Sequence, residues 1–235
     1  MNATQLPWPF PTQSTLDVHG SAQRLPVGRI FCVGRNYQGH AIEMGTLVDK
    51  STMQPFYFLK DSASLLSVPA GNTGALPYPP ATADFHHEAE LVVVIGKAGF
   101  QLKVEQAASL IHGYAVGLDM TRRDLQQTAK DSKRPWDVAK NFEHGAVCSA
   151  VVLNPALLST GEISLRVNGE LRQQGNLNQM IWNISELIAD LSRYYHLQPG
   201  DLLFTGTPEG VGPVVGGDRI EVSIAGVGEL KVKVV

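Results

Sequence analysis

Residues 91–96, Leu-Val-Val-Val-Ile-Gly, restrict the fold of this chain more than any other segment. Most of these side chains are β-branched, and the glycine ends the run, which is typical of a β-strand. A strand with one face in water alternates apolar and polar residues, whereas this run is apolar on both faces. It therefore predicts a central strand that is buried on both sides.

The rest of the chain predicts a β-rich α+β fold, because short strand-like runs outnumber helical ones. Strands are expected near 30–33, 163–167, 170–173, 201–205, 219–224 and 229–234, and helices near 104–112 and 121–131. The Asn168-Gly169 pair between two of the strands fits a type I′ turn and so predicts a hairpin.

Residues 180–195 carry apolar side chains every three or four positions, which predicts an amphipathic helix, with Asn178 as its N-terminal cap. Residues 40–45 form a single helical turn at most. Residues 46–55 and 69–84 show little periodicity and are expected to be long loops or lids.

The length of 235 residues suits one catalytic domain, which we place at residues 23–235. Residues 1–22 are rich in Pro, Thr, Gln and Ser and are expected to form an extended N-terminal arm. The 23 Gly and 14 Pro show no repeat and indicate many turns.

Charge and hydropathy exclude several function classes. The net charge is −3 and no run of basic residues occurs, so we expect no nucleic-acid partner. No segment reaches the roughly 18–20 apolar residues of a membrane span, and the N-terminus has no basic or apolar leader. Cys32 and Cys148 carry no pairing motif, which favours buried thiols in a cytoplasmic protein.

Three acidic residues predict a metal site. Glu88 and Glu90 precede the central strand two positions apart, so their side chains project to the same side. Asp119 ends another apolar segment, where a buried acid needs a partner. Three oxygen ligands suit Mg²⁺ or Mn²⁺. Taken alone, the Glu-x-Glu pattern could instead be a strand end in water that binds no metal. His86 and His87 are expected at the surface or behind the ligands.

His40 and Glu43 are three residues apart, so one helical turn places them side by side. A carboxylate beside an imidazole makes a general base for water, although such pairs also occur by chance on surfaces. Lys60 and Lys140 lie in apolar surroundings and could balance the acidic site or reach out to water. Residues 206–212 form a Gly-rich turn expected to line a pocket, because they lack the lysine of a phosphate loop.

Together these segments resemble the fumarylacetoacetate hydrolase family, in particular its small members that act on acylpyruvates. The matching stretches follow the family's order over residues 28–235: Val33-Gly34-Arg35-Asn36-Tyr37 with His40 and Glu43, Phe58-Leu59-Lys60, His87-Glu88-Ala89-Glu90-Leu91, Gly117-Leu118-Asp119-Met120-Thr121 with Arg123 and Gln126, Trp136 with Lys140, Asn168-Gly169, and 205–212. Asp61 and Val147 stand where many relatives carry proline, which puts only local loop shape in doubt.

The resemblance implies a mixed β-roll or barrel with short peripheral helices, usually dimeric. It implies Mg²⁺ or Mn²⁺ held by Glu88, Glu90 and Asp119. Catalytic roles are then expected for His40, Glu43 and Lys140, and substrate-binding roles for Lys60, Arg123, Gln126 and Thr207. Arg123 is expected to point toward the metal, and Lys60 toward the far wall of the pocket.

The resemblance also implies an activity, hydrolysis of the C–C bond of an acylpyruvate. Residues 78–84 and 118–126 are most similar to members that cleave fumarylpyruvate into fumarate and pyruvate in gentisate-type aromatic degradation. The alternatives are an oxaloacetate decarboxylase, a general acylpyruvase, a 2-oxo dienoate isomerase, and a silent module that binds a metal-chelated oxo acid. The His40–Glu43 pair argues against the last, since binding alone requires no general base.

Overall fold

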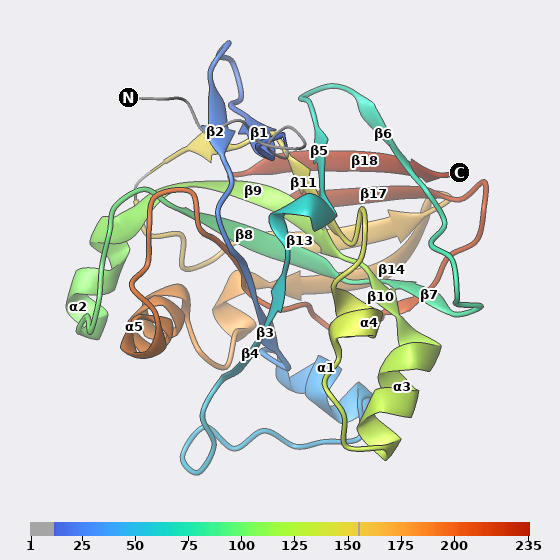
Figure 1. The fold of residues 1–235 in the computed structure, drawn as a ribbon, viewed down its shortest axis with the longest axis horizontal. Coiled ribbons are helices and arrows are strands. Elements are labelled where there is room, and N and C mark those ends of the chain that lie inside the picture. Colours follow the sequence, from blue (N-terminus) through green and yellow to red (C-terminus); the bar gives the residue numbers. More distant parts are fainter. Residues whose placement is uncertain (1–11, 155) are drawn as a thin grey trace, which may run out of the picture.

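The computed structural model describes residues 12–154 and 156–235, so half of the predicted N-terminal arm, residues 1–11, lies outside the described part. Two sheets dominate the molecule (Figure 1). The larger one has the order β4-β3-β15-β8-β9-β11-β5, and β12 pairs with β9 at its side. Its strands are β3 (Ile30–Gly34), β4 (Phe56–Lys60), β5 (Leu65–Val68), β8 (Ala89–Ile95), β9 (Ile111–Asp119), β11 (Ala146–Ser149), β12 (Val152–Leu153) and β15 (Leu202–Phe204).

The second sheet has the order β14-β13-β17-β18-β6. It contains β6 (Thr73–Leu76), β13 (Glu162–Val167), β14 (Glu170–Asn176), β17 (Arg219–Ile224) and β18 (Gly228–Val234). The predicted hairpin is confirmed: β13 and β14 pair antiparallel, and Asn168 and Gly169 both have positive φ, of 53° and 85°. The expected loop at 69–84 is partly wrong, because β6 pairs in parallel with β18.

Smaller elements surround these sheets. Two of them are small sheets: β1 (Thr15–Asp17) pairs with β2 (Arg24–Pro26), and β7 (Phe85–His87) lies between β10 (Thr121–Arg122) and β16 (Gly212–Pro213). The helices are α1 (Gln38–Glu43), α2 (Val104–Ala107), α3 (Arg123–Asp131), α4 (Asp137–Lys140) and α5 (Ile184–Tyr194). Short 3₁₀ turns occur at Ser62–Ser64, Ala108–Leu110 and Leu177–Gln179. In Figure 1, α1, α3 and α4 gather on one side of the sheets, and α2 and α5 on another. The β-rich α+β fold is confirmed.

Strand β8 is central, as its sequence predicts, and all seven of its residues are buried. Its odd-numbered side chains, such as Leu91 and Val93, pack in one core with the second sheet. Val92 and Val94 face the opposite way, into a second core that also contains Leu16 of β1 and Phe204 of β15. Both faces of the strand are therefore covered.

Helix α5 begins later than predicted, at Ile184, and Asn178 is not its cap. Asn183 caps it instead, since its side chain accepts a hydrogen bond from Glu186 N at 3.0 Å. The Glu186 side chain in turn accepts one from Asn183 N at 2.8 Å. This reciprocal arrangement is a capping box.

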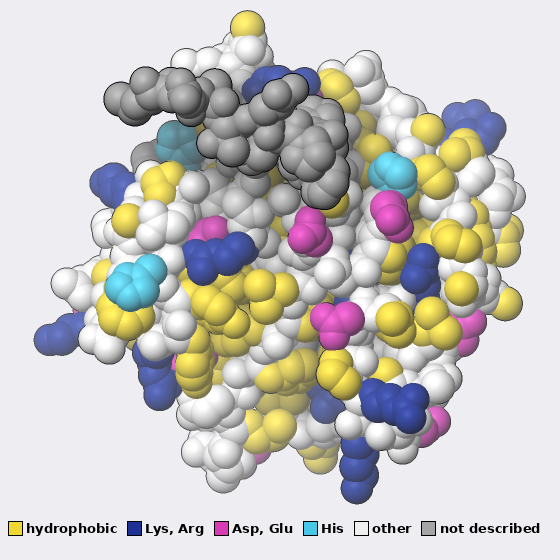
Figure 2. All heavy atoms as spheres, viewed as in Figure 1, with side chains coloured by type: hydrophobic (Ala, Val, Ile, Leu, Met, Phe, Trp, Pro, Cys, Tyr) yellow, Lys and Arg dark blue, Asp and Glu magenta, His cyan; other side chains and the backbone are white. Residues whose placement is uncertain are grey.

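Among the helices of the described residues, none is both long and apolar enough to cross a membrane. On the face shown in Figure 2, basic, acidic and apolar side chains are interspersed. Neither sign of charge dominates that face.

Candidate active site

The three predicted metal ligands come together at the ends of β8 and β9. The two strands pair antiparallel, with Ala89 opposite Leu118, so Glu88 lies beside Asp119 and Asp119 N donates to Glu88 O at 2.9 Å. Glu88, Glu90 and Asp119 each offer a carboxylate oxygen, and these oxygens all lie within 4.8 Å of one another. The three residues are at most 5% exposed. Water therefore does little to stabilise their charges.

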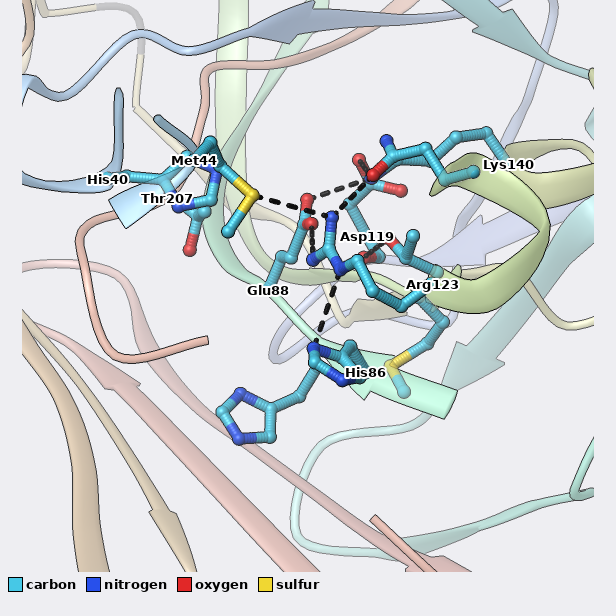
Figure 3. A network of polar contacts seen from close by, with 12 residues as sticks. His40, Met44, His86, Glu88, Asp119, Arg123, Lys140 and Thr207 are labelled. Atoms are coloured by element: carbon cyan, nitrogen blue, oxygen red, sulfur yellow. Dashed lines mark hydrogen bonds and ion pairs between the residues drawn. The ribbon is translucent and has the colours of Figure 1, made fainter. Parts of the chain in front are cut away.

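Three cationic side chains surround the carboxylates, and Figure 3 labels two of them, Arg123 and Lys140. Lys140 Nζ lies 2.8 Å from both Glu88 Oε2 and Asp119 Oδ2. Arg123 Nη2 lies 2.5 Å from Glu88 Oε1, and Lys60 Nζ lies 2.9 Å from Asp119 Oδ1. Burial opposes the charge of Lys140, but the charges of Asp119 and Glu88 outweigh it and raise its pKa. Lys140 is therefore held as a cation inside the site.

Glu88 and Glu90 differ in their electrostatic surroundings. Burial disfavours ionisation of Glu88, but Lys140 and Arg123 outweigh it and hold the pKa of Glu88 well below its ordinary value. Burial, followed by the charges of Asp119 and Glu88, raises the pKa of Glu90 well above its ordinary value. One of its oxygens accepts a hydrogen bond from Gly206 N at 2.7 Å. A bound divalent cation would offset the repulsion at Glu90.

The carboxylates fit a Mg²⁺ or Mn²⁺ ion. Lys60 Nζ lies 2.9 Å from the buried Asp119 Oδ1, and this oxygen accepts no hydrogen bond from the described residues. Glu88, Glu90 and Asp119 each place one oxygen within 4.8 Å of the other two, close enough for the three residues to hold one such ion together. The donors are all oxygen atoms, which is the set that these ions prefer.

The predicted general base lies in α1 and lines the same pocket. His40 Nδ1 lies 3.2 Å from Glu43 Oε2, which assigns the proton to Nδ1 and leaves Nε2 as the acceptor. Partial burial opposes ionisation of Glu43, but hydrogen bonds from His40 and Gly210 N lower its pKa. Glu43 is therefore an ionised partner that orients the imidazole.

Two residues that the sequence did not single out, Asn36 and Gln173, bind Thr205 and the Gly-rich segment 206–212 that follows it. Asn36 donates through Nδ2 to Thr205 O and Trp182 O, and Gln173 donates through Nε2 to Thr207 Oγ1 and Pro208 O. Gln173 Oε1 also accepts from Ala89 N, next to the acidic residues. Both side chains are fully buried, and a polar residue is hard to recognise as buried from the sequence.

Arg123 points toward the carboxylates, as expected, and also contacts Gln126, His86 and the Met44 sulfur. Its Nη1 donates to Gln126 Oε1 at 2.7 Å, and its Nε donates to His86 Nδ1 at 3.4 Å. His86 therefore lies behind the site (Figure 3). His87 is fully buried against Gln173, so a surface position is wrong for it.

The predicted position of Lys60 is also wrong. Its ammonium group is fully buried between Asp119 and the carbonyl oxygens of Met120 and Lys140, and it does not line the pocket. The sequence showed an apolar strand around Lys60 but not the direction of its side chain. The pocket is lined by the predicted His40, Glu88, Glu90, Asp119, Arg123, Gln126, Lys140 and Thr207, together with Val33, Gly34, Arg35, Met44, Phe58, Lys130 and Trp136.

Comparison with known proteins gives consistent matches. The sequence model described as fumarylacetoacetate (FAA) hydrolase C-terminal matches residues 29–235. A fumarylpyruvate hydrolase of a Ralstonia species is 53% identical over 192 residues, which cover 81% of this chain and 98% of that protein. A mitochondrial oxaloacetate decarboxylase of Dictyostelium discoideum is 40% identical over 84% of this chain and 89% of its own length.

Among solved structures, the fumarylpyruvate hydrolase of Pseudomonas aeruginosa in complex with Mn²⁺ and pyruvate superposes with a TM-score of 0.94. It is 45% identical, and the match covers 98% of this chain and 99% of that one. That relative binds Mn²⁺, and the acidic triad of this chain has the geometry to hold such an ion.

Proposed function

Because the chain belongs to the fumarylacetoacetate hydrolase family, we propose that it is a metal-dependent hydrolase that cleaves the C–C bond of an acylpyruvate. Its proposed substrate is fumarylpyruvate, which with one water gives fumarate, pyruvate and a proton. The matches with the two relatives named as fumarylpyruvate hydrolases cover 98% and 99% of the length of those proteins.

One observation carries the proposal: His40, which is paired with Glu43, lines the same pocket as the three carboxylates. Hydrolysis needs a general base for water and also a group that holds the 2-oxo acid. The divalent ion that Glu88, Glu90 and Asp119 would hold supplies a Lewis acid for the 2-oxo acid end.

The side chains divide the remaining steps. His40 Nε2 takes a proton from water, whose oxygen attacks the distal carbonyl carbon, and Glu43 stabilises the imidazolium that forms. The C–C bond then breaks, and its electron pair passes to the pyruvyl fragment as an enolate, which is protonated to pyruvate. Lys140 offers a cation near the developing negative charge, and Arg123, Gln126 and Thr207 offer donors to substrate oxygens.

A second candidate function is decarboxylation of oxaloacetate. The Dictyostelium relative is named for this reaction, and the same carboxylates could hold the same 2-oxo acid group. This reaction also forms the enolate of pyruvate but needs no activated water. The two functions therefore differ in their dependence on His40.

Turnover of fumarylpyruvate, acetylpyruvate and oxaloacetate with Mn²⁺ tests the proposal. We expect the highest kcat/KM for fumarylpyruvate. His40→Ala should keep Mn²⁺ affinity, which titration calorimetry measures, and lose about 10²–10⁴-fold in hydrolysis. Decarboxylation should fall less. Faster turnover of oxaloacetate than of both acylpyruvates would favour the second candidate.

We further infer a cytoplasmic homodimer that acts in aromatic degradation. Cys32 and Cys148 are buried free thiols, which suits a reducing compartment. The family resemblance supports the dimer, and the relatives that act on fumarylpyruvate support the pathway. Light scattering coupled to size-exclusion chromatography should give twice the mass of the 25.4 kDa chain.

A further inference from the structure

Four cationic side chains line the pocket, and they form two groups. Arg123 and Lys140 are paired with the carboxylates. Arg35 and Lys130 line the same pocket, yet neither side chain has an ion-pair or hydrogen-bond partner among residues 12–154 and 156–235. Both are only half-buried. Two unpaired cations are thus available to a ligand.

A continuous aromatic wall leads from the inner group to the outer one. Lys140 Nζ lies 5.0 Å from the centre of the Phe58 ring, and the centres of Phe58 and Trp136 are 6.0 Å apart. Lys130 Nζ lies 5.5 Å from the centre of Trp136. Starting at the carboxylates, the pocket therefore passes an apolar stretch before it reaches Lys130.

Arg35 lies at the same outer end. Its guanidinium is 5.8 Å from the centre of Phe56, which packs edge-on against Trp136 at 5.6 Å. Phe56 is 37% exposed and does not itself line the pocket, but the Trp136 ring that it contacts does. Arg35 also has a φ of 58°, which side chains other than glycine rarely adopt. This backbone conformation is held next to the pocket.

The two outer cations repel each other. Burial, and then the charges of Arg123 and Arg35, lower the pKa of Lys130 to about 8. An anion placed between Arg35 and Lys130 would offset these positive charges and favour the protonated form of Lys130. An apolar ligand would not.

We propose that Arg35 and Lys130 form a subsite for a second carboxylate, so that the pocket selects 2-oxo acids with a negative charge at the far end. The inference rests on the proposed function for the inner end of the pocket and extends it to the outer end. The ligand class is a linear 2-oxo dicarboxylate with an apolar or unsaturated middle. Phe58 and Trp136 would contact that middle part.

Equilibrium binding to the Mn²⁺-loaded protein tests the subsite without any turnover. 2-Oxopimelate and 2-oxoheptanoate have the same seven-carbon chain and the same 2-oxo acid end, and only the first carries a distal carboxylate. Neither has an acyl carbonyl to hydrolyse. Calorimetry on wild type should show at least about tenfold tighter binding of 2-oxopimelate, as for a charge-assisted hydrogen bond.

Arg35→Met and Lys130→Met should each lose most of this preference while keeping the affinity for 2-oxoheptanoate. Arg134→Met is the matched control: it removes an exposed positive charge near Trp136 that does not line this pocket. It should keep the preference. If Arg35→Met fails to bind 2-oxoheptanoate, Arg35→Gly replaces it, because glycine adopts the positive φ without strain.

The subsite is refuted if wild type binds the two ligands equally, or if both substitutions keep the preference. If Arg134→Met loses as much of the preference for 2-oxopimelate as the two other variants, long-range charge explains the preference and the subsite is refuted as well. Failure of the proposed function is a separate result, namely no hydrolysis of any acylpyruvate. It leaves this binding comparison intact.

Discussion

Glu88 and Glu90 are both buried, but the nearest charged groups differ in sign. Those next to Glu88 are positive, and those that act most strongly on Glu90 are negative. Lys140 and Arg123 pair with Glu88, whereas Glu90 has a backbone N–H and two other carboxylates beside it. Removal of Glu88 leaves the buried Lys140 and the partly buried Arg123 without one of their partners. Removal of the Glu90 charge relieves repulsion instead.

Neutralising these two ligands should therefore change stability in opposite directions. With the metal removed by a chelator, Glu88→Gln should lower the free energy of unfolding by about 3 kcal/mol, as for other broken buried ion pairs. Glu90→Gln should leave it unchanged or raise it. Both substitutions should weaken Mn²⁺ binding. Urea titrations measure the first effect and calorimetry the second, and equal losses of stability would contradict the charge assignment.

Lys60 supports Asp119 from behind the site and does not reach the outer pocket. We expect Lys60→Met to lower kcat/KM by the same factor for fumarylpyruvate and for acetylpyruvate, because both substrates share the reacting end. Steady-state kinetics on the two substrates measures this. A loss at least about tenfold larger for fumarylpyruvate alone would place Lys60 at the distal end after all.

At the scale of one element, the capping box of α5 allows a direct test. Asn183→Ala should lower stability by about 1 kcal/mol and Tm by roughly 2–4 °C, because Glu186 N loses its acceptor. Asn178→Ala is the control, since that side chain is exposed and makes no hydrogen bond within the described residues. Calorimetric melting of both variants checks the prediction. Equal shifts would contradict Asn183 as the cap.

Helix α5 begins later than its apolar periodicity predicts, because contacts with a residue far away in the sequence decide where it starts. Ile181 fits the helical periodicity, but its N–H donates to Asn36 O, and Trp182 N donates to Asn36 Oδ1. These bonds hold residues 181–182 outside the helix from a position far away in the sequence. Strand β8 could be predicted because its evidence is the composition of its own residues.

The same distinction applies to the site. Glu88, Glu90 and the His40–Glu43 pair have regular local spacings, so their proximity could be predicted from strand and helix geometry. The position of Lys60, by contrast, depends on how β4 packs against α4, which no local pattern records. Gln173 was missed for the same reason, because its partners lie in two distant segments.

At the scale of the whole molecule, β15 joins two parts of the site. It lies between β3, which leads to Asn36 and His40, and β8, which carries Glu90. Leu203 of β15 is opposite Phe31 on one side and Val93 on the other. In the sheet formed by the described residues, β15 thus connects the strand that leads to the base with the strand that carries Glu90.

Leu203→Ala should consequently lower the stability of the whole domain by about 2–5 kcal/mol, the range for a truncated core leucine. The urea midpoint for loss of far-UV circular dichroism and the midpoint for loss of hydrolysis should fall together, because the part of the sheet with β3 and the part with β8 both depend on β15. Val215→Ala, at an exposed side chain, should shift neither by more than about 0.5 kcal/mol. A shift of the activity midpoint alone would make β15 a local feature.

The place of β15 in the sheet has a consequence for biosynthesis. On the ribosome, β3 and β8 are completed long before residues 202–204 emerge, and until then the strand that belongs between them is missing. While residues 96–201 are being translated, the nascent chain therefore exposes two apolar strand edges, and such edges pair with other chains. Folding of the catalytic domain has to wait for its last sixth, so chaperone binding should be most important before that part is made.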